Sequence, residues 1–350
     1  MKQLWYLSIR FYIKIGIFFY TKKIKSVGKE NIPKKGAVLF VVNHPNGLID
    51  PLMVTTNTPR ITHYLVRAAS FKNPFVKRLL ASLNLMPIYR IRDGVKELSK
   101  NTEVFNDCYE ILNKQRALMI FPEGSHDRRR TIRTISKGFT RILFGAFEKY
   151  PNLKVTIIPV GVTYQNASQF SSKVAIHYGS PILANDFYNA NEINNSVNAL
   201  KNQVANQLKK LSVHIPADEN YQKTLQQLNV SNVDFTNVEL VNKSIETNKV
   251  THQKQMVNLA KPFYFLFVIN SISPWLLWKI ISKKVGEIEF IDTFRFALGI
   301  SLFPLFYLIQ AFTIYKLHNL QTALIYFVAS FIIVLLYSKL ATTPTESHLE

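Results

Sequence analysis

The sequence predicts an α/β fold with a mixed sheet, preceded by a helix at a membrane surface and followed by transmembrane helices. Three observations lead to this expectation. Short β-branched runs alternate with helical patterns over residues 29–185, which is typical of helices packed on a largely parallel sheet. Residues 1–28 are apolar and aromatic but carry cations. Residues 261–340 contain long, mostly uncharged apolar stretches.

The charge balance points to an anionic partner. Lysine and arginine number 43 against 22 acidic residues, so the formal net charge is +21. The basic residues flank apolar segments and no nucleic-acid-binding motif is present, so we expect an anionic phospholipid membrane and no nucleic acid. The single cysteine, Cys108, excludes an intramolecular disulfide, which suits a reducing cytoplasmic face. It lies in a helical pattern and is expected to be a packing residue.

Residues 1–28 are expected to form an amphipathic helix at the membrane interface. The apolar run is interrupted by Arg10 and Lys14 and is followed by three further lysines. These charges argue against a full span, and the run lacks the features of a signal peptide. We expect the rings in the lipid and the cations among the headgroups. The alternative is an ordinary first helix packed on the domain.

The central domain is expected to cover residues 29–185. Its strand-like runs lie at 37–42, 61–66, 85–89, 117–121, 155–161 and 174–178. Its helical patterns lie near 48–57, 74–83, 94–114 and 137–149. Strands and helices that alternate in this way predict an αβ sandwich.

Residues 186–260 are expected to form a polar, partly helical connector, because they are rich in Asn, Gln and Lys. Apolar residues at steps of three and four predict one amphipathic helix at its start. These residues are Ile193, Val197, Leu200, Val204, Leu208 and Leu211. From Pro216 to Gln255 the periodicity fades.

Two or three membrane helices are expected over residues 261–340, with a short tail at 341–350. The apolar stretches are Phe263–Leu277, Phe296–Tyr315 and Leu320–Tyr337. The last two approach the ~20 residues that cross a bilayer and follow one another closely, so they predict a helical hairpin. If the first stretch spanned the membrane, Lys283 and Lys284 would face away from the cytoplasm. We therefore expect it to be re-entrant or interfacial.

A histidine in a turn is the leading catalytic candidate. The apolar run 37–42 ends at Asn43-His44-Pro45-Asn46-Gly47, and Asp50 follows. A strand that delivers His44 into a turn, with a carboxylate behind it to fix the tautomer, is a common mount for a general base. The alternative assigns His44 to the turn and Asp50 to a helix N-cap.

Other classes of site find little support in the sequence. His126 and Asp127 lack a further ligand set, so no metal site is predicted, and no cofactor is expected. Glycine motifs for a nucleotide are missing. The nucleophile elbow of serine hydrolases is missing too, so Ser125 is not expected to form an acyl-enzyme.

Four blocks, taken in order, carry a resemblance. They are Asn43-His44 with Asp50, Leu85-Met86-Pro87-Ile88-Tyr89-Arg90, Phe121-Pro122-Glu123-Gly124-Ser125, and Ile158-Pro159-Val160-Gly161-Val162. Over roughly residues 30–185 the chain resembles the glycerol-phosphate and lysophosphatidic acid acyltransferase family. The resemblance implies a glycerol-3-phosphate acyltransferase-like αβ sandwich that moves an acyl group from a thioester to an alcohol.

The resemblance also implies roles for single residues. His44 is the expected general base and Asp50 its orienting carboxylate, with backbone N–H groups around the turn as candidate oxyanion donors. The expected contacts to the acceptor and its phosphate are Arg90, Glu123, Gly124, Arg128 and Lys137. Pro159 belongs to the block expected near the acyl chain.

One departure from the family pattern bears on the acceptor. The common pattern has four residues between the histidine and the aspartate, and this chain has five. Fungal-type enzymes that acylate glycerol 3-phosphate or dihydroxyacetone phosphate carry five, and the continuation His126-Asp127-Arg128 resembles them as well.

The expected function is O-acylation of lysophosphatidic acid, with acyl-CoA or acyl carrier protein as donor. Glycerol 3-phosphate or dihydroxyacetone phosphate is the alternative acceptor, and a related acylation of an aminolipid fits the same residues. The alternative of another class is an inactive, lipid-binding scaffold. The expected location is a membrane, either the bacterial cytoplasmic membrane or one of endoplasmic reticulum type, with the catalytic domain facing the cytoplasm.

Overall fold

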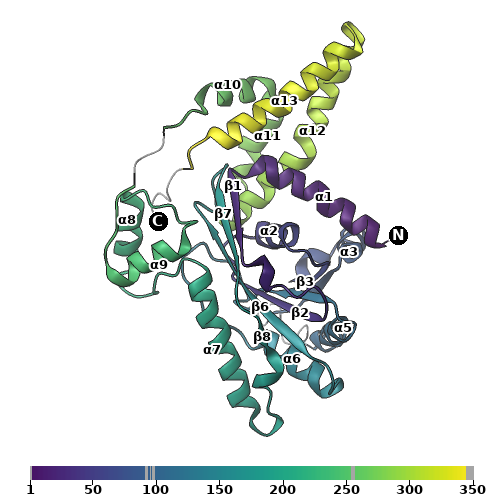
Figure 1. Cartoon of the computed structure of the whole chain (residues 1–350). Helices are drawn as coiled ribbons and strands as arrows, with labels where there is room; N and C mark the ends of the chain where they lie inside the picture. The colour runs from purple at the N-terminus through teal and green to yellow at the C-terminus, as the bar shows by residue number, and fades with distance from the viewer. Residues whose placement is uncertain (1, 91–93, 95, 97–98, 254–256, 344–350) are drawn as a thin grey trace.

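The computed structural model describes residues 2–90, 94, 96, 99–253 and 257–343. A twisted sheet lies at its centre, helices cover both faces of the sheet, and a helical hairpin projects away from these layers (Figure 1). This arrangement confirms the predicted αβ sandwich with a mixed sheet.

The sheet has eight strands, in the order β1-β7-β6-β2-β5-β3-β4, with β8 paired to β6. The strands are β1 (Lys23–Val27), β2 (Ala37–Val42), β3 (Thr62–Arg67), β4 (Leu85–Ile88), β5 (Ala117–Ile120), β6 (Val155–Tyr164), β7 (Lys173–Tyr178) and β8 (Ile182–Leu183). All pairs are parallel except those that β6 makes with β7 and β8. The parallel strands β2 and β5 therefore end at the same edge, where the loops after them meet.

The helices of the domain are α1 (Lys2–Tyr20), α2 (Ile49–Asn57), α3 (Pro74–Ser82), α5 (Asn101–Asn113), α6 (Gly138–Lys149) and α7 (Ile193–Leu211). Two further helices are α8 (Tyr221–Val230) and α9 (Val238–Thr247). The apolar helices are α10 (Lys261–Asn270), α11 (Ile272–Ser282), α12 (Ile291–Leu317) and α13 (Leu320–Leu340).

Strand β2 lies between two hydrophobic cores. Leu39 and Val41 pack with residues of α5, α6 and α7 on one face of the sheet. Phe40 and Val42 pack with residues of α1, α2 and α12 on the other face. All six residues of β2 are buried, which explains its unbroken apolar sequence. The strand is thus a rigid mount for the turn that follows it.

Most of the predicted elements form, with shifts of a few residues at their ends. The six predicted strands correspond to β2–β7. The helix predicted at 94–114 is described from Asn101 onward, and residues 95, 97 and 98 of that prediction lie outside the described residues. Strands β1 and β8 were not predicted. In β1 the lysines alternate with half-buried residues at the sheet edge, and the pairing with β7 defines the strand.

The segment after the sheet contains more packed structure than its fading periodicity predicts. Helices α8 and α9 enclose a small core with Phe235 and Leu228 fully buried at its centre. Ala175 of β7 belongs to this core, so the segment packs against the sheet. Arg130 places its guanidinium 3.6 Å from the centroid of the Phe235 ring, which ties this core to the loop after β5.

Helix α1 packs on the domain through one face and presents a second apolar face outward. Tyr6, Ile17 and Tyr20 are buried. The exposed apolar residues are Leu4, Trp5, Leu7, Phe11, Tyr12, Ile15 and Phe18. The expectation that its cations lie among headgroups is wrong for Arg10, because the Arg10 guanidinium donates to the carbonyls of Thr58 and Arg60.

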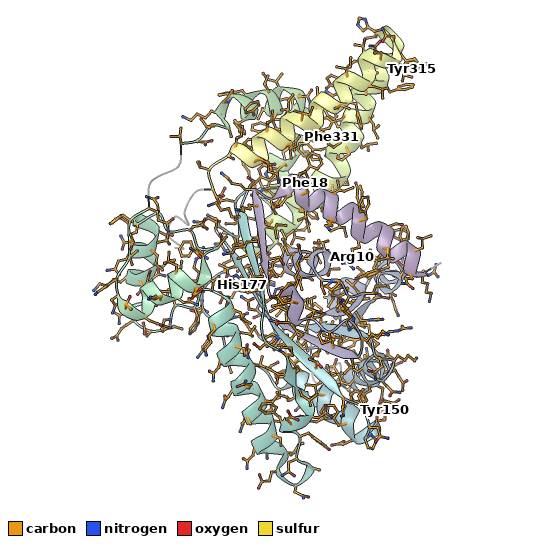
Figure 2. The ribbon with its side chains drawn as sticks, viewed as in Figure 1. Arg10, Phe18, Tyr150, His177, Tyr315 and Phe331 are labelled. Atoms are coloured by element: carbon orange, nitrogen blue, oxygen red, sulfur yellow. The ribbon has the colours of Figure 1, made fainter. Side chains whose placement is uncertain are left out.

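The apolar C-terminal region contains two helices long and apolar enough to cross a membrane, namely 288–317 and 320–340. Figure 2 shows Tyr315 near the far end of this hairpin and Phe331 alongside it, with Phe18 of α1 near its base. Helices α10 and α11 are bent by 97° at the break between them, so they form a broken span or a re-entrant pair.

A close approach between β6 and α7 yields the first prediction. A Cβ on Gly161 would lie 2.2 Å from the carbonyl oxygen of Leu211, which is closer than atoms can pack. We expect Gly161→Ala to push α7 off the sheet and to lower the free energy of unfolding by about 1–3 kcal/mol. Thermal unfolding in detergent measures this, with Gly286→Ala as the control, because Gly286 faces open space. Equal melting temperatures for the two variants would contradict the packing described.

Candidate active site

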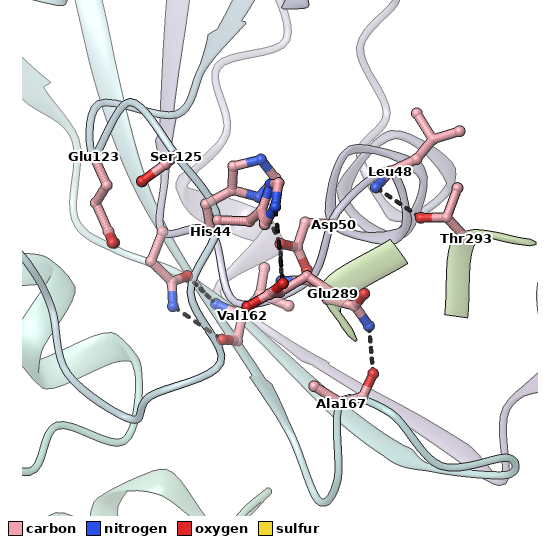
Figure 3. Close-up of polar contacts among 12 residues, drawn as sticks. His44, Leu48, Asp50, Glu123, Ser125, Val162, Ala167, Glu289 and Thr293 are labelled. Atoms are coloured by element: carbon pink, nitrogen blue, oxygen red, sulfur yellow. Dashed lines mark hydrogen bonds and ion pairs between the residues drawn. The ribbon is translucent and has the colours of Figure 1, made fainter. Parts of the chain in front are cut away.

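The turn after β2 brings His44 and Asp50 into direct contact. The Nδ1 atom of His44 lies 2.8 Å from Oδ2 of Asp50 (Figure 3). Asp50 is fully buried, whereas the His44 side chain is 17% exposed. Because a carboxylate accepts the proton on Nδ1, Nε2 keeps its lone pair. His44 lines a cavity together with Glu123 and Arg128, so its imidazole ring lies at the cavity wall.

Three donors from different parts of the fold converge on Asp50. Besides His44, the backbone N–H of Asn46 donates to Oδ2 at 2.7 Å and the hydroxyl of Tyr164 donates to Oδ1 at 2.7 Å. Burial raises the pKa of Asp50 above its usual value, and these hydrogen bonds oppose that rise. Asp50 lies in the first turn of α2, where the helix dipole also favours a negative charge. The N-cap alternative is wrong, because Asp50 lies inside the helix.

The backbone around His44 is held by strand β6 on one side and by the loop after β5 on the other. The side chain of Asn43 exchanges two hydrogen bonds with the backbone of Val162 in β6, at 2.7 and 3.1 Å. The carbonyl of His44 accepts the N–H of Asp127 at 3.0 Å. Its ring stacks on Phe121, with centroids 4.2 Å apart. The loop after β5 therefore supports the turn after β2.

Glu123 faces the same cavity and is ion-paired. The Arg133 guanidinium donates to Oε2 of Glu123 at 2.6 Å and to Oγ of Ser125 at 2.6 Å. The Glu123 side chain is 3% exposed. Burial raises its pKa, and Arg133 opposes that rise. Its Oε1 atom has no hydrogen-bond partner among the described residues. One carboxylate oxygen is therefore fixed by Arg133, and the other is left for a donor.

Two arginines border this loop. Nη1 of Arg90 donates to the carbonyl of Gly124 at 3.4 Å, so Arg90 lies beside the residue with which it was predicted to act. Arg128 lines the cavity and donates to the hydroxyl of Ser168 at 2.7 Å. In the described part of the chain no carboxylate pairs with Arg128, so its positive charge is not neutralised locally.

The remaining predicted residues lie apart from the cavity wall. Lys137 is exposed just before α6, and Pro159 lies within β6 beside Val41 of β2; neither lines the cavity. Arg129 and Arg130 line the cavity beside Arg128, but Arg129 pairs with Asp127 at 2.7 Å and Arg130 donates to the backbone carbonyls of Tyr164 and Gln165.

The expectation about backbone oxyanion donors needs correction for two residues. The N–H of Asn46 is taken by Asp50, and the N–H of Leu48 by the hydroxyl of Thr293 at 3.1 Å. Neither amide is left to hold an oxyanion. Among the residues that the structure describes, no group of three or more His, Cys, Asp or Glu residues is placed to hold a metal ion.

A protein-family model described as Acyltransferase matches residues 23–163, which run from β1 through most of β6. This stretch is similar to members of the Acyltransferase family, and we refer to it as the acyltransferase domain. The match includes the turn after β2 and the loop after β5, so His44, Asp50, Glu123 and Arg128 lie inside it, whereas Tyr164 lies just beyond its end.

Three curated relatives share parts of the chain. A glycerol-3-phosphate O-acyltransferase 2 of Saccharomyces cerevisiae is 32% identical over 88 residues, 25% of this chain and 12% of the relative. A probable 1-acyl-sn-glycerol-3-phosphate acyltransferase of Mycoplasma pneumoniae is 29% identical, over 43% of this chain and 57% of the relative. The 1-acyl-sn-glycerol-3-phosphate acyltransferase of Borreliella burgdorferi is 28% identical, over 39% and 52%. The chain thus spans at most little more than half the length of these relatives.

A solved structure also matches. It is that of the 1-acyl-sn-glycerophosphate acyltransferase of Thermotoga maritima, with a TM-score of 0.44 and 18% sequence identity. The match covers 59% of this chain and 81% of that chain.

Several residues of the acyltransferase domain and its surroundings were not singled out from the sequence. Tyr164 ends β6, beyond the end of the strand predicted at 155–161, and its position after an apolar run was the one available signal. Arg133 lies ten residues after Glu123, in a segment without periodicity, so nothing local indicated the pair. Asn46 was seen only as turn chemistry, although it is fully buried.

The buried Glu123–Arg133 pair yields a pH-dependent prediction. The pKa of Glu123 is raised on folding, so the folded state binds more protons above the unfolded pKa, and stability falls as pH rises through the folded pKa. Arg133→Met removes the group that opposes this rise, so the folded-state pKa of Glu123 rises further. The pH range over which stability falls then extends to higher pH. We expect a loss of about 3 kcal/mol near neutral pH and a smaller loss near pH ~5.

Denaturant unfolding of both proteins at several pH values measures the difference. Arg128→Met is the matched control, because Arg128 contacts a neutral hydroxyl and its loss leaves no described carboxylate unpaired. A loss for Arg133→Met that does not change with pH would contradict the role given to the pair.

Proposed function

We propose that the acyltransferase domain transfers a fatty acyl group from the thioester of acyl-CoA or acyl carrier protein to the hydroxyl of lysophosphatidic acid. The observation that carries the proposal is the 2.8 Å contact between His44 and the buried Asp50, at the wall of a cavity shared with Glu123 and Arg128. The names of the bacterial relatives support the same acceptor class.

The chemistry needs one base that later acts as an acid. Nε2 of His44 removes the proton of the acceptor hydroxyl while the oxygen attacks the thioester carbonyl. The tetrahedral intermediate then expels the thiolate, and the imidazolium returns the proton to the sulfur. Asp50 stabilises the imidazolium between these steps, because its carboxylate remains on Nδ1. General-base help of this kind contributes about 10²–10⁴ in rate.

The residues around His44 suit a glycerol phosphate. Arg128 brings a positive charge to the cavity, and Arg90 lies beside Gly124 at the edge of the same loop. The Oε1 atom of Glu123 has no hydrogen-bond partner among the described residues, which supports a role in accepting a hydrogen bond from a glycerol hydroxyl while Oε2 is held by Arg133. The phosphate and the reacting hydroxyl would thereby be fixed by different residues.

Glycerol 3-phosphate or dihydroxyacetone phosphate is the second candidate acceptor. The five-residue spacing between His44 and Asp50 favours it, as does the similarity to relatives named glycerol-3-phosphate O-acyltransferases. An inactive lipid-binding scaffold is disfavoured, because His44, Asp50 and Glu123 are all present and His44 and Asp50 are in contact.

Acyl transfer by the purified protein in lipid tests the proposal. Labelled acyl-CoA and acyl carrier protein are offered with lysophosphatidic acid, glycerol 3-phosphate and dihydroxyacetone phosphate in parallel. We expect product mainly from lysophosphatidic acid, and a loss of about 10²–10⁴ in kcat for His44→Ala and Asp50→Asn. His252→Ala, an exposed histidine outside the domain, is the control. An active His44→Ala variant would sink the proposed mechanism.

We further propose that α10 and α11 form a re-entrant pair, with both ends on the side of the acyltransferase domain. Tyr264 of α10 lies beside Tyr337 near the end of α13, and Trp278 of α11 lies beside Arg295 near the start of α12. The break between the two helices reaches only to the middle of the hairpin, where Ser271 bonds Tyr307.

Polar contacts support a break at that depth. Asn270 donates to Ser330 of α13 at 3.0 Å and accepts from Tyr326 at 2.6 Å, and its carbonyl accepts from Gln310 of α12 at 3.2 Å. An interrupted helix is tolerated within a bilayer where neighbouring helices satisfy its polar groups. Lys283 and Lys284 would then lie on the domain's side of the membrane, in accord with the basic-inside bias.

Cysteine labelling tests this topology in sealed vesicles. The native Cys108 is fully buried and serves as a silent background. We expect a membrane-impermeant maleimide to label Lys284→Cys from the side of the acyltransferase domain, and His318→Cys, in the loop of the hairpin, from the opposite side. The arrangement would be contradicted if Lys284→Cys were labelled from the side opposite the domain and His318→Cys from the side of the domain. Labelling of both variants from one side would contradict it as well.

A further inference from the structure

The start of α12 touches the turn that carries His44. Residues 289–293 lie against residues 46–48, although the two segments are about 240 positions apart in the sequence. Figure 3 shows Thr293 and Glu289 beside Leu48 and Asp50. The apolar hairpin therefore begins at the candidate active site.

Asp292 is the centre of this contact. It is 3% exposed, and its Oδ2 atom accepts from Nδ2 of Asn46 at 3.2 Å. Its Oδ1 atom accepts from Tyr20 of α1 at 2.6 Å and from Arg295 at 2.8 Å. A buried carboxylate is stable only with such partners. Asp292 thus joins α1, α12 and the turn through one group.

Two further contacts fix the same turn. The hydroxyl of Thr293 accepts the N–H of Leu48 at 3.1 Å. A Cβ on Gly47 would lie 3.0 Å from both the carbonyl of Glu289 and the hydroxyl of Thr293, so the two backbones approach closely. Three successive residues of the turn are therefore held by the start of α12.

We propose that Asp292 is a positioning residue for the His44–Asp50 pair, acting through Asn46. The backbone N–H of Asn46 donates to Asp50 while its side chain donates to Asp292, so one residue connects the two carboxylates. Asn46 also donates to the carbonyl of Ala167, which leaves it little freedom while Asp292 is in place. The inference rests on the proposed function, because the positioned group is the proposed base.

The same contact explains how a longer turn stays ordered. Five residues separate His44 from Asp50, and three of them, residues 46–48, are contacted by residues 289–293. Loss of that support would let the turn sample other conformations without disturbing β2, which is held by two cores. An error of about 1 Å in the placement of a catalytic group lowers its rate by up to roughly 10².

Two measurements on the full-length protein in lipid test the inference. Hydrogen exchange followed by mass spectrometry reports the amides of Asn46, Gly47, Leu48 and Asp50, and acyl-transfer kinetics report kcat and KM. For Asp292→Ala we expect exchange in this turn to accelerate about tenfold with β2 unchanged. We expect kcat to fall roughly 10- to 100-fold with the KM for the acceptor unchanged. Asp292→Asn keeps an acceptor oxygen, so we expect it to retain most of the wild-type protection of the turn amides and most of the wild-type kcat.

Ser301→Ala is the matched control, because the Ser301 hydroxyl bonds only the Ala297 carbonyl within α12. If Asp292→Ala fails to fold, Thr293→Val removes the single bond to Leu48 with little change of shape, and faster exchange in the turn is again expected. Turn exchange in Asp292→Ala equal to that of the control overturns the inference, whatever the activity. If Asp292→Ala does not fold, equal exchange in Thr293→Val overturns it. Faster turn exchange in a protein whose wild type transfers no acyl group leaves the positioning contact standing and sinks the proposed function instead.

Discussion

The site depends on one buried carboxylate. Asp50 is removed from water and accepts hydrogen bonds from the ring of His44, the backbone of Asn46 and the hydroxyl of Tyr164. A buried charge without partners destabilises a fold by several kcal/mol, so these three donors must be in place whenever the domain is folded. The turn after β2, helix α2 and strand β6 therefore meet at one point, and the tautomer of His44 follows from it.

The membrane-directed helices and the candidate site form one structure. Helix α12 begins at the turn, and α13 returns to the domain, where Lys339 donates to the carbonyl of Thr21 at 2.5 Å. Helix α1 contacts the start of α12, because the hydroxyl of Tyr20 donates to Asp292. The apolar faces of α1 and of the hairpin thus hold a fixed relation to His44.

Local pattern predicted the parts of this site that are encoded locally. The run before His44 is apolar throughout because β2 is covered on both faces, and Asp50 follows close enough in sequence to be paired with the histidine. Tyr164 and Asp292 could not be predicted, because they reach the turn across 114 and 246 positions through the register of β6 and the packing of α12. Strand β1 and the core of α8 and α9 were missed for the same reason, since tertiary contacts define them.

The central claim is that Asp50 fixes the tautomer of His44 that carries its proton on Nδ1. Nitrogen-15 NMR of histidine-labelled protein in lipid measures this directly, with His44→Ala identifying the signal. In the neutral ring we expect the proton on Nδ1 and none on Nε2, and a loss of this preference in Asp50→Ala. A proton on Nε2 in the wild-type protein would contradict the account, because the nitrogen that faces the acceptor would then be unable to remove its proton.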